Sequence, residues 1–306
     1  MMINVIGKKW LFLGISGALV LASVVAISAY GFREGIDFRG GTLWQVASPD
    51  AALTEASLRE FLAEQGMEDA VITRENQNGS FLVRIRAITE EEHQADLAAL
   101  TLKFGGAEEL GFQSIGPSIG AELRRRAFWG IGFVLIGISL FIAFAFRKVS
   151  RPIRSWKYGV VTLVTLFHDV VIPAGLFAYL GRFYGVEADT NFIVALLVVM
   201  GFSVHDTIVV FDRIRENLLL GREGAGLAEV VNKSINETLA RSINTSVTLV
   251  LVLVALLLFG PATLTYFVLA ILVGVILGTY SSIFVASPLL VIWHAFAAGR
   301  SPGRGN

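Results

Sequence analysis

Six apolar runs recur along this chain of 306 residues, and each is near or above the length of about twenty residues that an α-helix needs to cross a bilayer. Because lipid cannot satisfy backbone hydrogen-bonding groups, such runs cross the membrane as helices. The last run is too long for one crossing and extends beyond the lipid. The pattern predicts membrane-spanning helices at Trp10–Tyr30, Ala127–Phe146, Tyr158–Leu180, Phe192–Phe211, Ile243–Phe259 and Leu264–His294.

The composition supports a membrane protein and excludes several other classes. Hydrophobic residues make up 54% of the chain and charged residues 16%, whereas a soluble domain carries about a quarter charged residues. The formal net charge is zero, so the chain lacks the basic excess that binds nucleic acid. It has no cysteine, which excludes disulfides and thiolate metal sites.

The first apolar run resembles a secretory signal, because Lys8 and Lys9 precede it. A signal peptide's apolar region has only about 7–15 residues, and this run is longer. Residues 1–31 are therefore expected to be an N-terminus followed by a retained first span.

The basic residues predict the orientation, because short cytoplasmic loops are enriched in lysine and arginine. The loop after the third span holds one such residue, Arg182, and the loop after the fifth span holds none. The segment between the first two spans is then external, and both termini are cytoplasmic. Arg124–Arg126 are an exception to this rule, because they lie at the outer start of the second span. The loops after the second and fourth spans hold Arg147, Lys148, Arg151, Arg154, Lys157, Arg213, Arg215, Arg222, Lys233 and Arg241.

Residues 32–122, between the first two spans, have the pattern of a small α+β domain. Alternating and helical periodicities, with the turn sequence NQNGS between the middle strands, predict the order βαββαβ of a ferredoxin-like fold. His93 falls on a charged helix face and is expected to be a surface residue. The predicted elements are Thr42–Ser48, Thr54–Gln65, Ala70–Glu75, Ser80–Arg86, Thr89–Lys103 and Glu109–Ile115. The chain is thus predicted to be a polytopic α-helical membrane protein of six spans, with residues 123–306 forming spans two to six and the C-terminus.

Three consecutive spans carry polar residues at helical spacing, although ionisable groups in lipid are costly and usually mark a functional pathway. The third span carries Asp169 on such a stripe, with His168 next to it. The fourth carries Asp206, with His205 next to it. The three stripes are Thr162, Thr165 and Asp169; Ser203, Asp206 and Thr207; and Arg241, Asn244, Thr245 and Thr248.

The depths of these residues in the membrane can be compared from the helical rise. Asp206 lies about 22 Å along its helix from Asn191, and Asn244 lies about 22 Å from Phe259, so the two are level. Arg241 is one turn nearer the cytoplasm, within reach of a long side chain. A nearby guanidinium favours an ionised carboxylate and burial disfavours it. An arginine that approaches and withdraws would therefore let Asp206 take up and release a proton.

Two simpler interpretations compete with a proton relay. A buried Asp–Arg pair can hold two helices together, as hydroxyl side chains also do in membranes. His168–Asp169 and His205–Asp206 could indicate a metal site, but neighbouring helix residues point about 100° apart, and no H-E-x-x-H motif is present.

Two further patterns concern packing. Small residues recur at every fourth position at Gly14, Ala18, Ala22 and Ala26 in the first span, and at Ala270, Gly274, Gly278, Ser282 and Ala286 in the last. Such faces allow close helix contacts, one within the chain and the other with a partner subunit. After the break GREGAG, residues 227–239 form an amphipathic pattern, predicted as a helix along the membrane surface or a solvated connector.

Several stretches resemble the SecF family of protein-export membrane subunits, which is related to the resistance-nodulation-division transporters. The stretches are GIDFRGG, GFSVHDTIVVFDRIREN, SINETLARSINTS and GTYSSIFVASPLL. With the six spans and single external domain, the resemblance covers nearly the whole chain. His205 stands where the family more often has asparagine, which leaves open whether it adds a second titrating group.

The resemblance implies an accessory subunit of the Sec protein translocase in the cell (inner) membrane. It implies a partner SecD, docking to the SecYEG translocon, YajC as a further candidate partner, and contact with membrane lipid and the translocating unfolded polypeptide. It maps the proton-linked residues onto Asp206 and Arg241. The expected activity is protein export driven by the proton gradient, with the proton as coupling ion, no cofactor and no enzymatic reaction.

The alternative function is half of a proton-coupled exporter of small molecules. Such pumps carry larger paired domains in two long loops, whereas this chain has one small domain in one loop. Protein export is therefore the favoured prediction, and the expected proton relay consists of Asp206, Arg241, His205, Asn244, Asp169 and His168.

Overall fold

The structure is a computed structural model that describes residues 3–48, 53–74, 79–146, 153–220 and 226–299. It divides into a helical unit, residues 1–33, 130–186 and 191–306, and an α+β unit, residues 34–129 and 187–190. The main segment of the second unit begins and ends later than the predicted 32–122. The predicted turn NQNGS, the break GREGAG and the basic residues Arg147, Lys148, Arg151 and Arg222 lie wholly or partly outside the described ranges.

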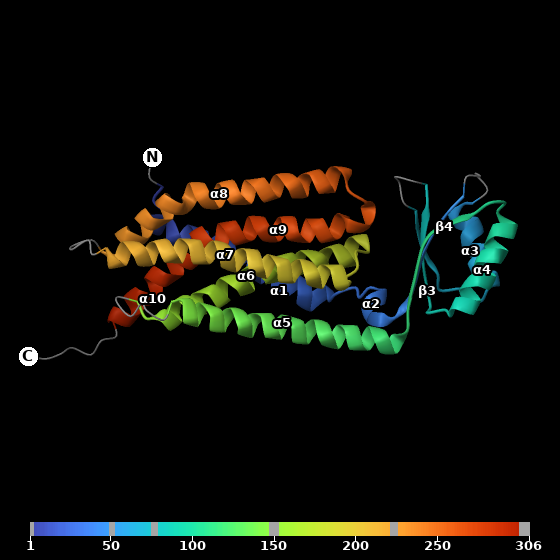
Figure 1. Cartoon of the computed structure of the whole chain (residues 1–306), viewed down its shortest axis with the longest axis horizontal. Coiled ribbons are helices and arrows are strands. Elements are labelled where there is room, and N and C mark those ends of the chain that lie inside the picture. Colours follow the sequence, from blue (N-terminus) through green and yellow to red (C-terminus); the bar gives the residue numbers. More distant parts are fainter. Residues whose placement is uncertain (1–2, 49–52, 75–78, 147–152, 221–225, 300–306) are drawn as a thin grey trace, which may run out of the picture. The chain divides into compact units, whose positions relative to one another are not determined.

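Six helices long and apolar enough to cross a membrane occur in the described ranges, which confirms the predicted number of spans. Figure 1 shows them running side by side in the helical unit. Short 3₁₀ turns, η1 (Ile6–Lys8) and η2 (Ala262–Leu264), precede the first and last spans. The spans are α1 (Lys9–Tyr30), α5 (Pro117–Ala145), α6 (Ser155–Tyr184), α7 (Thr190–Leu219), α8 (Leu227–Phe259), and α9 (Thr265–Ser281), which continues through the π-helical segment η3 (Ser282–Ala286) into α10 (Ser287–Gly299).

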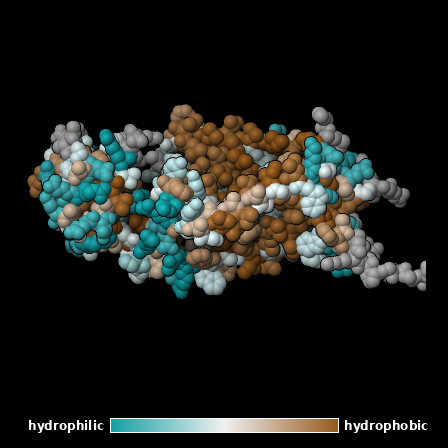
Figure 2. All heavy atoms as spheres, turned by 180° about the vertical axis from the view of Figure 1, so that it is seen from behind, coloured by the Kyte–Doolittle hydropathy of each residue, from teal (hydrophilic) through white to brown (hydrophobic). Residues whose placement is uncertain are grey.

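The spans differ in how far they are buried by their neighbours. α6, α7 and the α9–α10 span are the most buried, and α1, α5 and α8 the least. Large apolar side chains cover the outer faces, including Trp10 on α1 and Phe133 on α5. Figure 2 shows this hydrophobic surface on one face of the helical unit. Exposed apolar side chains are what a lipid-facing surface requires.

Small residues let α9 approach α7 closely, as the sequence predicted for a contact within the chain. A Cβ atom at Gly274 would lie 2.1 Å from Val199 Cγ2, and one at Gly278 would lie 3.2 Å from Ser203 Cβ. The small face of α1 is different: a Cβ at Gly14 would meet no atom within 4 Å. That face is open on this chain.

Both predictions for residues 227–239, a helix along the membrane surface and a solvated connector, are wrong. These residues form the first part of α8, which runs unbroken for 33 residues to Phe259. Its sequence has no glycine or proline after Gly226 to end a helix. The apolar face of this segment, with Val231 and Ile235 fully buried, packs into the helical core and not on a membrane surface.

The α+β unit confirms the predicted ferredoxin-like order. Its elements are β1 (Gly41–Ala47), α3 (Glu55–Glu64), β2 (Val71–Arg74), β3 (Phe81–Ile85), α4 (Glu90–Lys103) and β4 (Glu108–Ile115), after a one-turn helix α2 (Ile36–Arg39). The strands form one antiparallel sheet in the order β2-β3-β1-β4. Figure 1 shows α3 and α4 on one face of this sheet. Alternation along β1 and β3 turns Trp44, Val46 and Val83 into the core.

Capping boxes define where the two helices begin. Thr54 and Thr89 each accept a hydrogen bond from the backbone N–H three residues later, and the residue at that position binds back. These reciprocal bonds satisfy helix-end N–H groups that would otherwise lack partners. The spacing of Thr89 and Glu92 matches the sequence pattern of a capping box.

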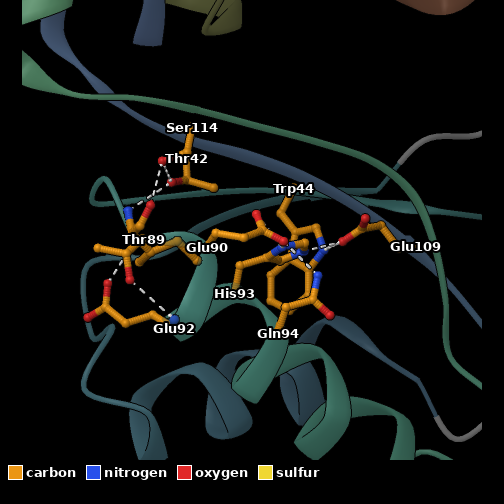
Figure 3. Close-up of polar contacts among 10 residues, drawn as sticks. Thr42, Trp44, Thr89, Glu90, Glu92, His93, Gln94, Glu109 and Ser114 are labelled. Atoms are coloured by element: carbon orange, nitrogen blue, oxygen red, sulfur yellow. Dashed lines mark hydrogen bonds and ion pairs between the residues drawn. The ribbon is translucent and has the colours of Figure 1, made fainter.

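His93 is buried, so the surface position predicted for it is wrong. Its ring stacks on Phe112 at 3.5 Å, and its Nε2 lies 2.5 Å from Glu109 Oε2, which also accepts a hydrogen bond from Trp44 Nε1. Figure 3 shows His93 close to Trp44 and Glu109. Polar residues surround His93 in the sequence, but its partners come from β1 and β4, which the helix pattern alone cannot indicate.

Residues 187–190, at the start of α7 and just before it, belong to the α+β unit. Ala188 forms a parallel bridge with Glu34, and the Thr190 N–H donates to Asp37 at 2.8 Å. Glu187 forms an ion pair with Arg84 of β3 at 3.1 Å. These contacts hold Glu187, Ala188 and Thr190 within the α+β unit.

Candidate functional site

Asp169 lies at the centre of a buried polar cluster inside the helical unit. Its side chain is 0% exposed. Its carboxylate accepts hydrogen bonds from Ser281 Oγ on α9 at 2.6 Å and from Ser203 Oγ on α7. His168 Nδ1 lies 2.8 Å from the other carboxylate oxygen. Three helices thus meet at one carboxyl group.

Asp206 is the second buried carboxyl group, and it is held by the same helix. Its Oδ2 accepts a hydrogen bond from Ser282 Oγ, the neighbour of Ser281. The adjacent Thr207 is also buried, and its hydroxyl has no hydrogen-bond partner among the described residues. Consecutive serines of one span therefore each bind one intramembrane aspartate.

The local sequence explains how α6 and α7 present these groups. Thr162, Thr165 and Asp169 share one face of α6, and all three are buried. The two threonine hydroxyls donate to carbonyls of their own helix, at 2.9 Å to Tyr158 and Thr162, so they are satisfied without a partner helix. Both predicted stripes, on α6 and α7, therefore face the protein interior.

The predicted stripe on α8 faces the other way. Arg241, Asn244, Thr245 and Thr248 are exposed on this chain. The buried face carries Ser242 and Ser246 instead, and Ser246 binds Thr279 of α9. Both sets of residues repeat at helical spacing, so periodicity alone does not decide which face is internal.

The structure does not bring Arg241 to Asp206. Within the described ranges Arg241 forms no ion pair, and no lysine or arginine lies within ion-pair distance of either buried carboxylate. His205 is exposed as well. Of the six residues predicted for a proton relay, the chain unites Asp206, Asp169 and His168 around two serines and leaves Arg241, His205 and Asn244 on its surface.

Ser281 and Ser282 are the site residues for which sequence reasoning assigned the wrong role or none. Ser282 was taken only as part of a small packing face, and Ser281 was given no role. The signal was present as two adjacent hydroxyl residues within an apolar span, in the sequence TYSSIF. The sequence does not show how α9 is rotated about its own axis, and this rotation turns both hydroxyls toward carboxylates.

The chemistry of this cluster accommodates a carboxyl group in either protonation state. A buried carboxylate needs hydrogen-bond donors or a counter-charge, and here serine hydroxyls and the His168 ring surround the two carboxyl groups. A carboxyl group in such a setting can exist as anion or acid without losing its partners, because a hydroxyl can donate or accept. Among the described residues no group of three or more histidine, aspartate and glutamate side chains could hold a metal ion.

Comparison with known proteins shows the family to which the chain belongs. Residues 97–295 match the family described as protein export membrane protein SecD/SecF, C-terminal. The chain is 43% identical to the protein translocase subunit SecF of Thermobaculum terrenum over 96% of this chain and 94% of that protein. It is 37% identical to SecF of Anaerolinea thermophila over 96% and 95% of the two chains.

Fused relatives and a solved structure extend the comparison. The chain is 39% identical to the protein translocase subunit SecDF of Thermus thermophilus, over 91% of this chain but 37% of that protein. The crystal structure of Thermus thermophilus SecDF, a translocon-associated membrane protein, matches with a TM-score of 0.81 at 36% identity and covers 96% of this chain and 39% of that one. This chain is therefore a multi-pass membrane protein of the SecD/SecF family of protein-export membrane proteins.

Proposed function

We propose that the chain is the SecF-type subunit of a Sec translocase and uses the proton gradient, together with SecD, to drive late steps of protein export. The observation that carries the proposal is the pair of buried carboxyl groups, Asp169 and Asp206, within the spans. Ionisable groups within membrane spans are costly, and they usually mark a transport or proton pathway. We assign the chain no enzymatic reaction and no cofactor other than the transported proton.

Protonation would act through the charge of the two aspartates. A charged carboxylate attracts the hydroxyl and histidine groups around it, whereas the neutral acid attracts them less strongly. Each proton that moves down a potential of 100 mV releases about 2.3 kcal/mol, enough to change an equilibrium between two helix arrangements about fiftyfold. That free energy is sufficient to alternate the packing of α6, α7 and α9 around the cluster.

The exposed polar stripe of α8 supports a partner within the membrane. An arginine facing lipid costs about 2.5–3.5 kcal/mol on insertion scales, so Arg241 and Asn244 are better placed against another protein. We assign SecD to this face, where Arg241 would tune proton binding from the subunit interface. The fused SecDF relative supports this partner because its single chain carries both names.

The remaining assignments follow the family and the charge pattern. Basic residues after α5 and α7 support cytoplasmic termini and an external α+β domain. Docking to SecYEG, association with YajC and contact with an unfolded polypeptide extend the same proposal.

The test measures export in membrane vesicles with and without a proton gradient. Asp206→Asn keeps the side-chain shape but cannot ionise, so gradient-stimulated export should fall to the level without gradient. The matched control is Asp212→Asn, the same change on the same helix at a largely exposed carboxylate paired with Arg215. Normal stimulation in the Asp206→Asn vesicles, with normal expression, would make the buried carboxylates structural and overturn the proposal.

A further inference from the structure

Ser281 and Ser282 each have two possible hydrogen-bond acceptors, and this is the feature that the proposed function leaves unexplained. Ser281 Oγ lies 2.6 Å from Asp169 Oδ2 and 3.2 Å from the carbonyl of Gly278. Ser282 Oγ lies close to Asp206 Oδ2 and 3.0 Å from the carbonyl of Thr279. A serine hydroxyl has one proton, so it can donate to only one of these acceptors at a time.

The charge on the aspartate decides between the two acceptors. A hydrogen bond to an ionised carboxylate is about twice as strong as one to a neutral carbonyl. While an aspartate is charged, its serine therefore donates to it across the helix interface. When the aspartate is protonated, the serine is free to donate to its own helix, at the carbonyl three residues earlier.

The helix geometry changes where the two serines lie. α9 ends at Ser281, and the π-helical segment η3 begins at Ser282. Ser287 Oγ donates to the Ser282 carbonyl at 3.2 Å, a bond across five residues that adds a side-chain donor to this wide turn. Single π-helical turns within α-helices occur frequently at functional sites and mark places where the bonding register of the helix changes.

We propose that Ser281 and Ser282 are positioning residues that couple the charge of Asp169 and Asp206 to the register of the α9–η3 helix. The proposal deepens the proposed function, on which it rests for its role in export. Loss of charge at either aspartate returns a hydroxyl to the α9 backbone at the start of the π-helical turn. The hydrogen bonding of one helix thereby depends on the charge of both carboxyl groups, through two neighbouring serines.

The other groups around the two carboxylates are few. His168 and Asp169 are the titratable groups that α6 contributes to the cluster, and Tyr280 of α9 stacks near the His168 ring at 6.4 Å. On α7 the neighbour of Asp206 is His205. α8 contributes the neutral Ser242 beside Asp206 and turns Arg241 outward. Ser281 and Ser282 are therefore the hydrogen-bond donors from the α9–η3 helix to Asp169 and Asp206, respectively.

The test uses dicyclohexylcarbodiimide, an apolar reagent that modifies protonated carboxyl groups in membranes. The full chain is labelled in its native membrane across a pH series, and the adducts at Asp169 and Asp206 are quantified separately by mass spectrometry. Ser281→Ala removes a donor from Asp169 only, and Ser282→Ala removes a donor from Asp206 only. Because a donor favours the ionised form, its loss should extend labelling of that one aspartate to higher pH.

The expected shift is about one pH unit, a tenfold change in proton affinity, at the aspartate whose serine is replaced and much less at the other. Ser16→Ala is the matched control, because Ser16 is a buried serine of α1 without a hydrogen-bond partner in the described structure. Unchanged midpoints in both serine variants, or equal shifts at both aspartates in each, would overturn the proposal. The labelling does not depend on export. The pH shifts can therefore be interpreted even if the export test contradicts the proposed function.

Discussion

Replacing Gly274 by alanine tests the packing that holds α9 against the aspartate-bearing helix α7. A new Cβ would lie 2.1 Å from Val199 Cγ2 and 2.6 Å from Val199 Cγ1, inside contact distance for both methyl groups. Val199 is fully buried and β-branched, so its side chain has few alternative rotamers. The helices must therefore separate or distort.

The expected cost follows from a comparison with a second glycine. Overpacking a buried contact costs about 1–3 kcal/mol. A glycine-to-alanine change also favours a helix by about 1 kcal/mol, but that gain is common to Gly274→Ala and Gly14→Ala. At Gly14 no atom would meet the new Cβ within 4 Å. The difference between the two variants therefore isolates the overpacking, about 1–3 kcal/mol against Gly274→Ala.

The assay is thermal unfolding of the purified chain in detergent, with Val199→Ala completing a double-mutant cycle. Val199→Ala removes both obstructing methyl groups, so the double variant should be more stable than the sum of the two single effects by about 1–3 kcal/mol. Equal stability of Gly274→Ala and Gly14→Ala, or additive effects at residues 274 and 199, would refute the close approach of α9 and α7.

Two further predictions concern the α+β domain and the N-terminus, each measured by amide hydrogen exchange in the full chain. Burial, and after it the negative charge of the nearby Glu92, raises the pKa of Asp96 above its ordinary 3.8. The domain therefore loses stability as the pH rises from 3.8 through that raised pKa. Asp96→Asn should stabilise the domain and slow exchange in α4 at pH 7, and this gain in stability should vanish below about pH 3.8. Unchanged exchange at pH 7 would show that burial of the charged Asp96 does not destabilise the domain. Asn232 Oδ1 accepts from the Val5 and Ile6 N–H groups at 2.9 and 3.2 Å, so Asn232→Ala should cost this segment about 1–3 kcal/mol and speed exchange at both amides. Unaltered protection there would show that the asparagine does not hold the N-terminal segment.

The fold was predictable because its main determinants are local. Apolar runs of sufficient length define spans wherever they occur, and the domain's strands and capping boxes follow from alternation and from residues such as Thr89. The error at residues 227–239 has a local cause as well. An amphipathic pattern packs equally well on a membrane surface or on a protein core, and only α7 beside it decides which.

The site was predictable in its carboxylates but not in their partners. Asp169 and Asp206 stand out because charge is rare in apolar runs. Their partners depend on the rotation of α9 and α8 about their own axes, which sets Ser281 and Ser282 inward and Arg241 outward. For His93 the same limit applies, since strands β1 and β4 bury a residue whose neighbours on α4 are charged.

The central claim is that Asp206 carries protons, and proton flux tests it most directly. The chain and SecD are reconstituted in liposomes with a trapped pH dye, and a potential is imposed across the membrane. Wild-type chain and the exposed-site control Asp212→Asn should acidify the lumen at equal rates, whereas Asp206→Asn should reduce the rate to that of protein-free liposomes. A flux in Asp206→Asn liposomes equal to that of the wild type would contradict the claim.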